Sequence, residues 1–94
     1  MIYGEAVATR FSRQHADSGK WIQRFLKIVA AAEWADFVAL KQSFPSADLG
    51  RKTGRVIFGV CNNKYRLIAA VKFEERELLI ESVLTHKEYD RETF

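Results

Sequence analysis

The sequence predicts an α+β fold in which N-terminal helices pack on one face of a small antiparallel sheet, with a short helical turn at the C-terminus. In the first half of the chain, apolar residues recur every three or four positions, as they do on one face of a helix. After position 54 they alternate with polar residues or form runs rich in β-branched residues, as in strands. The length of 94 residues suits one compact domain, so we expect residues 1–94 to form a single unit.

The composition excludes several classes of protein. With 48% hydrophobic and 29% charged residues, the chain lies in the ordinary globular range. Its apolar runs are too short to span a bilayer, which takes about 20 such residues, and the N-terminal segment lacks the pattern of a secretory signal. The single cysteine, Cys61, has no partner for an internal disulfide. We therefore expect a protein of the cytoplasm or another reducing compartment, without membrane contact.

The N-terminal segment predicts a short strand followed by a helix. Residues 1–3 are apolar and suit a brief edge strand. A helical pattern begins at Ala6, with Phe11 on its apolar face. Asp17 and Ser18 are favourable N-cap residues, so we expect one helix to end before them and another to begin.

Two further helices are predicted before position 45. The second has an amphipathic pattern, with apolar residues at Trp21, Ile22, Phe25, Leu26, Ile28 and Val29. The third carries Trp34, Phe37, Val38 and Leu40 on its apolar face. Phe44 ends it, because the following proline disfavours helical geometry in the residue before it. We expect both tryptophans to anchor the core or its edge.

The second half predicts a three-stranded antiparallel meander. Residues 55–60, 64–73 and 78–85 have strand composition. Residues 61–63 (CNN) form the first turn, because asparagine tolerates the left-handed conformation, and residues 74–77 (EERE) form the second. Short turns of this kind join antiparallel neighbours.

Alternation along the middle strand assigns its two faces. One set is apolar throughout and is expected to face the helices: Tyr65, Leu67, Ala69, Val71 and Phe73. The other set is basic at both ends and is expected to face solvent: Lys64, Arg66, Ile68, Ala70 and Lys72. The sheet should therefore have one buried face and one mixed, cation-bearing face.

The net charge of +3 is unevenly distributed. Residues 49–73 contain no acidic residue and six basic ones: Arg51, Lys52, Arg55, Lys64, Arg66 and Lys72. Residues 74–94 reverse the balance, with seven acidic residues and three basic ones. The basic middle would attract a phosphate backbone. An ordinary solvated loop and strand edge would look the same, so both interpretations stay open.

Residues 85–90 (THKEYD) also support two interpretations. Thr85 and Glu88 have the spacing of a capping box, which would start a final helical turn. His86 has an unperturbed pKa of about 6.5, which suits proton transfer near neutrality. Its neighbours supply a cation, a phenol and a carboxylate: Lys87, Tyr89 and Asp90. The other carboxylates and histidines are scattered, so neither a metal site nor a cofactor is expected.

The register of the last hairpin decides whether His86 meets the basic strand. A turn centred on residues 75–76 pairs residues whose numbers sum to 151, so that Arg66 lies opposite Thr85 and Tyr65 lies opposite His86. This register places His86 on the helix-covered side, away from Arg66. A bulge, or rotation of the chain after Thr85, would bring both into one cleft.

Four motifs in order resemble the HigB-type toxins of the RelE/ParE superfamily. They are FPSAD (44–48), RVIF (55–58), NKYRLI (63–68) and THKEYD (85–90). The resemblance runs from about residue 15 to residue 89. It implies a type II toxin that acts as a ribosome-dependent mRNA endonuclease and is neutralised by a helix-turn-helix antitoxin of the HigA type. Operator DNA would be contacted only through the antitoxin complex.

The resemblance also assigns site residues. By motif position it places Arg66, His86, Lys87 and Tyr89 in the active cleft, with Lys64 and Asn63 beside them. The sequence departs from the family pattern at Cys61 and Asn62, where two glycines are common, and at Gly59, where a polar residue is common. A gyrase-directed toxin like the ParE branch, or an inactive homologue that only binds antitoxin and operator, remains an alternative.

Overall fold

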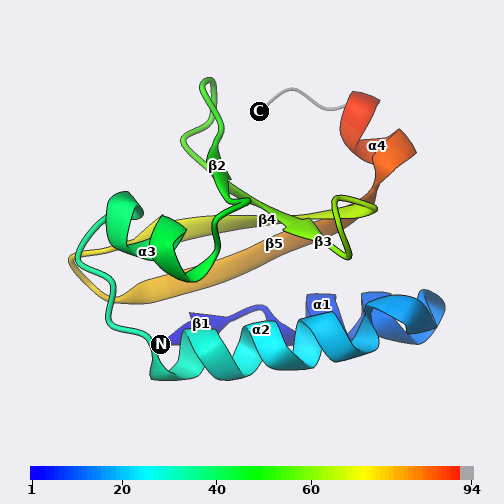
Figure 1. Ribbon diagram of the computed structural model, residues 1–94, viewed down its shortest axis with the longest axis horizontal. Coiled ribbons are helices and arrows are strands. Elements are labelled where there is room, and N and C mark those ends of the chain that lie inside the picture. Colours follow the sequence, from blue (N-terminus) through cyan, green and yellow to red (C-terminus); the bar gives the residue numbers. More distant parts are fainter. Residues whose placement is uncertain (92–94) are drawn as a thin grey trace.

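A five-stranded sheet forms the centre of the molecule (Figure 1). The computed structural model describes residues 1–91. In chain order the elements are β1 (Ile2–Tyr3), α1 (Glu5–Gln14), the 3-10 helix η1 (Ala16–Ser18), α2 (Gly19–Ala31), α3 (Phe37–Ser43), β2 (Asp48–Leu49), β3 (Val56–Val60), β4 (Tyr65–Lys72), β5 (Glu77–Thr85) and α4 (His86–Arg91). The strand order is β1-β5-β4-β3-β2. The α+β prediction is confirmed.

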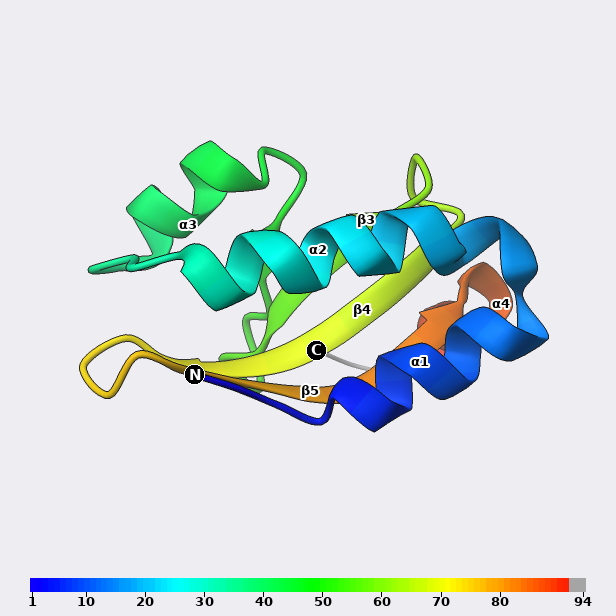
Figure 2. The same ribbon diagram turned by 90° about the horizontal axis from the view of Figure 1, so that it is seen from below.

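Helices α1 and α2 run in opposite directions across one face of the sheet (Figure 2). Their predicted apolar faces are buried, at Ala8 and Phe11 in α1 and at Ile22, Phe25 and Val29 in α2. The rings of Phe25, Phe44 and Phe58 lie 4.9 to 5.2 Å apart and join α2, the end of α3 and β3 into one core. No helix within residues 1–91 is both long and apolar enough to cross a bilayer.

Two details of the predicted helices are wrong. Helix α3 begins only after Asp36, whose side chain accepts a hydrogen bond of 3.0 Å from the backbone N–H of Ala39, so Trp34 precedes the helix. Ser18 occupies the N-cap position of α2, as predicted, but its side chain makes no capping hydrogen bond. The hydroxyl of Ser18 donates to the carbonyl of His15, while Asp17 binds side chains from β4 and the turn before it.

The sheet is mixed, which corrects the prediction of a purely antiparallel one. The predicted edge strand β1 exists, but it pairs in parallel with β5, placing Ile2 beside Leu78. Gly4 makes this possible, since it has a φ of 80° and a Cβ there would overlap the carbonyl oxygen of Ile80. Strand β2, which pairs with β3, was not among the predicted strands.

The predicted register of the last hairpin is also wrong. The turn comprises residues 73–76 and is closed by a hydrogen bond from the N–H of Arg76 to the carbonyl of Phe73. The numbers of two paired residues therefore sum to 149 near this turn. A bulge at Glu81 raises this sum to 150 further from the turn. As a result, Arg66 lies opposite Leu84, and the strand ends at Thr85.

The side chains on the two faces of β4 differ less in burial than predicted. Tyr65, Leu67 and Ala69 are buried in the helix-covered core as expected. On the other face, however, Ile57 and Ile68 are also buried, with 6% and 1% exposure. On this face of β4, cations are therefore confined to the two ends of the strand, at Arg66 and Lys72.

Candidate functional site

The capping box at the end of β5 is confirmed. The backbone N–H of Thr85 donates to Glu88 at 2.9 Å, and the N–H of Glu88 donates to the Thr85 hydroxyl at 3.2 Å. These hydrogen bonds lower the pKa of the Glu88 carboxyl, because they favour its charged form. The reciprocal pair fixes where α4 begins and therefore where its side chains point.

Arg66 and Tyr89 meet across β4 and α4. The guanidinium carbon of Arg66 lies 5.2 Å from the centre of the Tyr89 ring, in a cation–π arrangement. The guanidinium donates to the backbone carbonyl of Asn63 and, at 3.4 Å, to that of Tyr65. Within residues 1–91 no carboxylate lies within ion-pair distance of Arg66, so its positive charge is held in place without being neutralised by an acidic side chain.

The Arg66 guanidinium borders a polar cavity of about 340 Å³, which we call the main cavity. Its walls are Pro45, Ser46, Asp48, Ile57, Gly59, Asn63, Arg66 and Tyr89. Three predicted site residues, Asn63, Arg66 and Tyr89, are thus brought together. Sequence reasoning did not select Ser46 and Asp48 as site residues, although both lie in the FPSAD motif.

His86 and Lys87 do not line the main cavity. The chain rotates into α4 directly after Thr85, so the His86 side chain is 63% exposed and does not lie beneath the helices. Its Nδ1 lies 3.1 Å from a carboxylate oxygen of Asp90, one helical turn further on. Lys87 is exposed.

Lys64 lies on the other side of the sheet from Arg66, which corrects the predicted alternation. Its ammonium group is 2.6 Å from the carboxylate of Asp17, which also accepts a hydrogen bond of 2.9 Å from the Tyr65 hydroxyl. The hydrogen bond from Lys64 is the main reason that the pKa of Asp17 is lowered. Lys64 precedes β4 and follows the left-handed residues 61–63, so the strand alternation does not apply to it.

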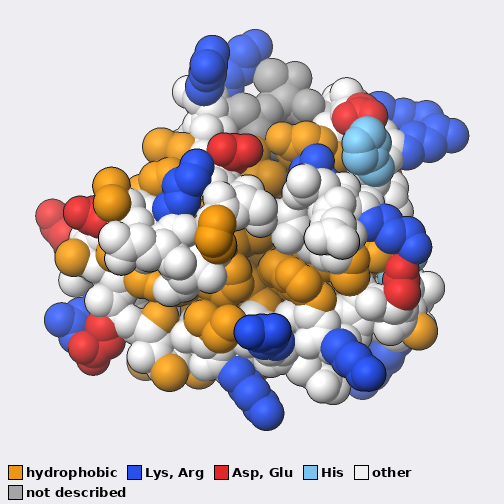
Figure 3. All heavy atoms as spheres, in the orientation of Figure 1, with side chains coloured by type: hydrophobic (Ala, Val, Ile, Leu, Met, Phe, Trp, Pro, Cys, Tyr) orange, Lys and Arg blue, Asp and Glu red, His pale blue; other side chains and the backbone are white. Residues whose placement is uncertain are grey.

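The remaining basic candidates are spread around the molecule. Arg51 and Lys52 are exposed in the loop after β2, and Lys72 is exposed at the far end of β4. Arg55 is paired with Glu81 at 2.7 Å. Lys and Arg side chains project from the loop after β2, near α4 and along α2, around a centre with few charges (Figure 3).

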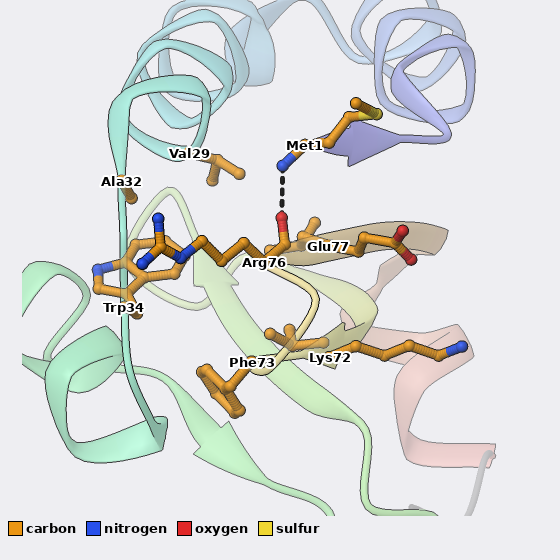
Figure 4. Close-up of a pocket in the computed structure, with 10 residues that line it drawn as sticks. Met1, Val29, Ala32, Trp34, Lys72, Phe73, Arg76 and Glu77 are labelled. Carbon is orange, nitrogen blue, oxygen red and sulfur yellow. Dashed lines mark hydrogen bonds between the residues drawn. The ribbon is translucent and has the colours of Figure 1, made fainter.

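A small pocket with both polar and apolar walls lies at the opposite end of the sheet (Figure 4). Trp34 and Arg76 border it, and the N-terminal ammonium group of Met1 donates to the Arg76 carbonyl. Its volume is only about 30 Å³. Arg76 is paired with Glu33 at 3.4 Å, in contrast to Arg66 at the main cavity. We therefore interpret this pocket as a packing feature.

No three His, Cys, Asp or Glu side chains within the described residues gather closely enough to hold a metal ion. The side chains that line the main cavity offer a guanidinium, a phenol, a carboxamide, a hydroxyl and a carboxylate. A guanidinium can bind the oxygens of a phosphate.

Comparison with known proteins identifies the family of this chain. Residues 18–92 match the family model of HigB_toxin, described as the RelE-like toxic component of a toxin–antitoxin system. The chain is 42% identical over 53 residues to the mRNA interferase toxin HigB of Escherichia coli K12, and equally to the mRNA interferase HigB of Escherichia coli O157:H7 and of Shigella flexneri.

Each of these alignments covers 55% of this chain and 51% of the relative, so the chain spans about half the length of the curated relatives it matches. The family match is broader, because it includes the FPSAD, RVIF and NKYRLI motifs, the THKEYD motif and all strands from β2 onward. The chain belongs to the HigB family of RelE-like toxins, the toxic components of toxin–antitoxin systems.

Proposed function

We propose that this protein is an mRNA interferase, an endoribonuclease that cleaves translated mRNA on the ribosome. The observation that carries the proposal is Arg66, whose guanidinium has no acidic partner among the described residues and borders the main cavity. Family membership and the printed names of the relatives support the same activity.

The reaction we propose needs no metal. The ribose 2′-oxygen attacks the adjacent phosphorus, a new P–O2′ bond forms and the P–O5′ bond breaks. The products are a 2′,3′-cyclic phosphate and a 5′-hydroxyl. A base takes the proton of the 2′-hydroxyl, and an acid gives one to the departing 5′-oxygen. Arg66 would stabilise the charge that builds up on the phosphorane oxygens, which is often the largest contribution to catalysis.

Helix α4 would supply the proton transfer. His86 and Tyr89 are three residues apart and are therefore neighbours on the helix surface, and the Tyr89 ring contacts Arg66. In our proposal His86 acts as acid or base, and Asp90, 3.1 Å from its Nδ1, orients the imidazole. Tyr89 would contact a base of the RNA or assist proton transfer. Lys87 would add positive charge at the rim.

The partners follow from the proposed activity. We propose that a HigA-type helix-turn-helix antitoxin neutralises the toxin in the cytoplasm, and that operator DNA is contacted only through that complex. The exposed Arg51 and Lys52 would contact ribosomal RNA beside the mRNA, because a flexible basic side chain binds a phosphate backbone without reading its sequence. Lys72 lies at the other end of β4, so a contact there would require a second RNA segment.

Primer extension on mRNA after induced expression tests the proposal. New 5′ ends inside translated regions are expected for the wild-type protein and for Lys64→Ala, and not for Arg66→Ala. The two variants are matched, because each removes one cation near the start of β4. Growth arrest without new mRNA ends would instead indicate a protein target such as gyrase, and normal growth an inactive homologue.

A further inference from the structure

We propose that this toxin has a second nucleotide subsite next to the main cavity, in which a nucleobase stacks against Trp21. The proposal rests on the function proposed above. The evidence is a second cavity of about 290 Å³ lined by Trp21, Ser46, Gly59, Cys61, Asn62 and Asn63. Three of these residues, Ser46, Gly59 and Asn63, also line the main cavity, so the two cavities adjoin.

Gly59 lies where the two cavities meet. It pairs with Arg66 across β3 and β4, so both positions share one face of the sheet. A Cβ at Gly59 would overlap the side-chain oxygen of Asn63 and come within 3.4 Å of the Ser46 hydroxyl. A larger residue here would therefore obstruct the passage from one cavity to the next.

The walls of the second cavity suit a base better than a phosphate. None of its six lining side chains carries a formal charge, whereas Arg66 and Asp48 border the main cavity. Two asparagine carboxamides and a serine hydroxyl can donate and accept hydrogen bonds, as the edge of a nucleobase does. An RNA chain with its phosphate at Arg66 would place a neighbouring base here.

Trp21 has the properties of a stacking platform. Its ring packs nearly parallel to Phe25, with centroids 5.2 Å apart and an interplanar angle of 14°, and lies 6.3 Å from the ring of Phe44. These contacts hold the indole in place while the residue remains only half-buried. Single-stranded nucleic acids commonly stack on such partly exposed aromatic rings.

Combining a substitution of Trp21 with the removal of one base from the RNA tests the subsite. We would measure cleavage of mRNA on programmed ribosomes by the full-length wild-type toxin and by Trp21→Ala and Trp21→Phe, with Trp34→Phe as the matched control. Each substrate would carry one abasic nucleotide, placed at successive positions on both sides of the cut. The substrate without its base removes the stacking partner while keeping the phosphates.

We expect that the loss of cleavage rate caused by the protein substitution and the loss caused by the abasic nucleotide do not combine. Trp21→Ala should cleave the intact mRNA about tenfold more slowly, which corresponds to a stacking energy in the usual range for one base. At one abasic position the wild type should slow by the same factor, and Trp21→Ala should slow no further. Trp21→Phe should retain most of the activity, and Trp34→Phe should behave as the wild type.

Several results would overturn the subsite. Losses that multiply at every abasic position would mean that Trp21 acts only through folding, and an unchanged rate in Trp21→Ala would mean that no base stacks there. Weakened neutralisation by the antitoxin, with unchanged cleavage, would assign this cavity to the antitoxin. If the wild type itself cleaves nothing, the proposed function fails first, and the subsite fails with it.

Discussion

Lys64 and Arg66 are two cations separated by one residue, yet their surroundings differ. Lys64 is held 2.6 Å from Asp17 on the helix side, where the same carboxylate also binds Tyr65. Arg66 lies on the opposite side, against the ring of Tyr89 and at the wall of the main cavity. The charge of Lys64 links η1 to the start of β4, whereas the charge of Arg66 remains available to a ligand.

Whether a cation can bind a ligand depends on the partner that it already has. An ion pair satisfies the ammonium group of Lys64, so binding a phosphate there would first require breaking that pair. Arg66 is oriented only by neutral carbonyls and an aromatic ring among the described residues. A phosphate could therefore bind Arg66 without displacing an acidic side chain.

The largest effect is expected for Arg66→Ala. Removing a preorganised group that stabilises the charge of the transition state should slow cleavage on the ribosome by roughly 10²–10³-fold. Arg66→Lys should recover only part of the rate, since an ammonium group lacks the planar fork of a guanidinium. Thermal unfolding should confirm that both variants fold. Full activity in Arg66→Ala would show that the charge of Arg66 is no more important for cleavage than the paired charge of Lys64.

His86→Ala should have the next largest effect. If His86 transfers a proton, its removal should slow the chemical step by about 10²-fold, at the low end for general acid–base catalysis. Single-turnover cleavage measures this step directly. Asp90→Asn should have a smaller effect, because it leaves the imidazole in place but weakens its orientation. An unchanged rate in His86→Ala would leave proton transfer to Tyr89 and solvent.

A smaller effect is expected for Thr85→Ala, which removes the side-chain half of the capping box. Loss of an N-cap destabilises a helix by about 1 kcal/mol. Because α4 carries Tyr89, the ring should contact Arg66 less often and cleavage should slow modestly. Thr85→Ser is the control and should restore both properties. Urea unfolding and the cleavage rate should change together, and a stable but inactive Thr85→Ala would contradict the capping argument.

The smallest effect concerns the Lys64 side of the comparison. Hydrogen bonding from Lys64 lowers the folded-state pKa of Asp17 below its ordinary value of 3.8. This carboxylate therefore stabilises the fold above pH 4, and its contribution is lost as the pH falls through the lowered pKa. Wild-type protein should be more stable than Asp17→Asn at neutral pH, by a small margin because the pair is partly exposed.

The difference between the two proteins should shrink as the pH falls below 4. Urea midpoints between pH 7 and pH 3 measure it. The pKa of Glu88 is lowered too, but Glu88 titrates in both proteins, so its effect cancels in the difference. A gap that stays constant with pH would show that Asp17 stabilises the fold by packing and not by its charge.

Local sequence patterns predicted much of the fold. The apolar faces of α1 and α2, the meander of β3, β4 and β5, the edge strand β1 and the capping box are all confirmed. All of these except β1, which pairs with the distant β5, depend on interactions between residues close in sequence. The antiparallel character of the whole sheet was wrongly predicted because it depends on a distant partner of β1. The register of the last hairpin was wrong because its turn lies one residue earlier and β5 contains a bulge.

The predictions about the candidate site were also partly right and partly wrong. Arg66, Tyr89 and Asn63 were selected from their motifs, and they line one cavity. Lys64 was placed on the face of Arg66 because strand alternation was extended into a turn, where three successive left-handed residues reverse the chain. Ser46 and Asp48 were missed, because β2 brings them to the cavity through only two paired residues, too few for a recognisable pattern.

Periodicity and neighbouring residues were enough to predict the helices, the longer strands with their apolar faces, and the helical turn that starts at Thr85. Only the tertiary structure brings together charged groups from distant segments. The approach of η1 to β4 joins Asp17 and Lys64, which are more than 40 residues apart, and the parallel entry of β1 sets Ile2 beside Leu78. Pairing between distant segments depends on distance in space, which no local pattern encodes.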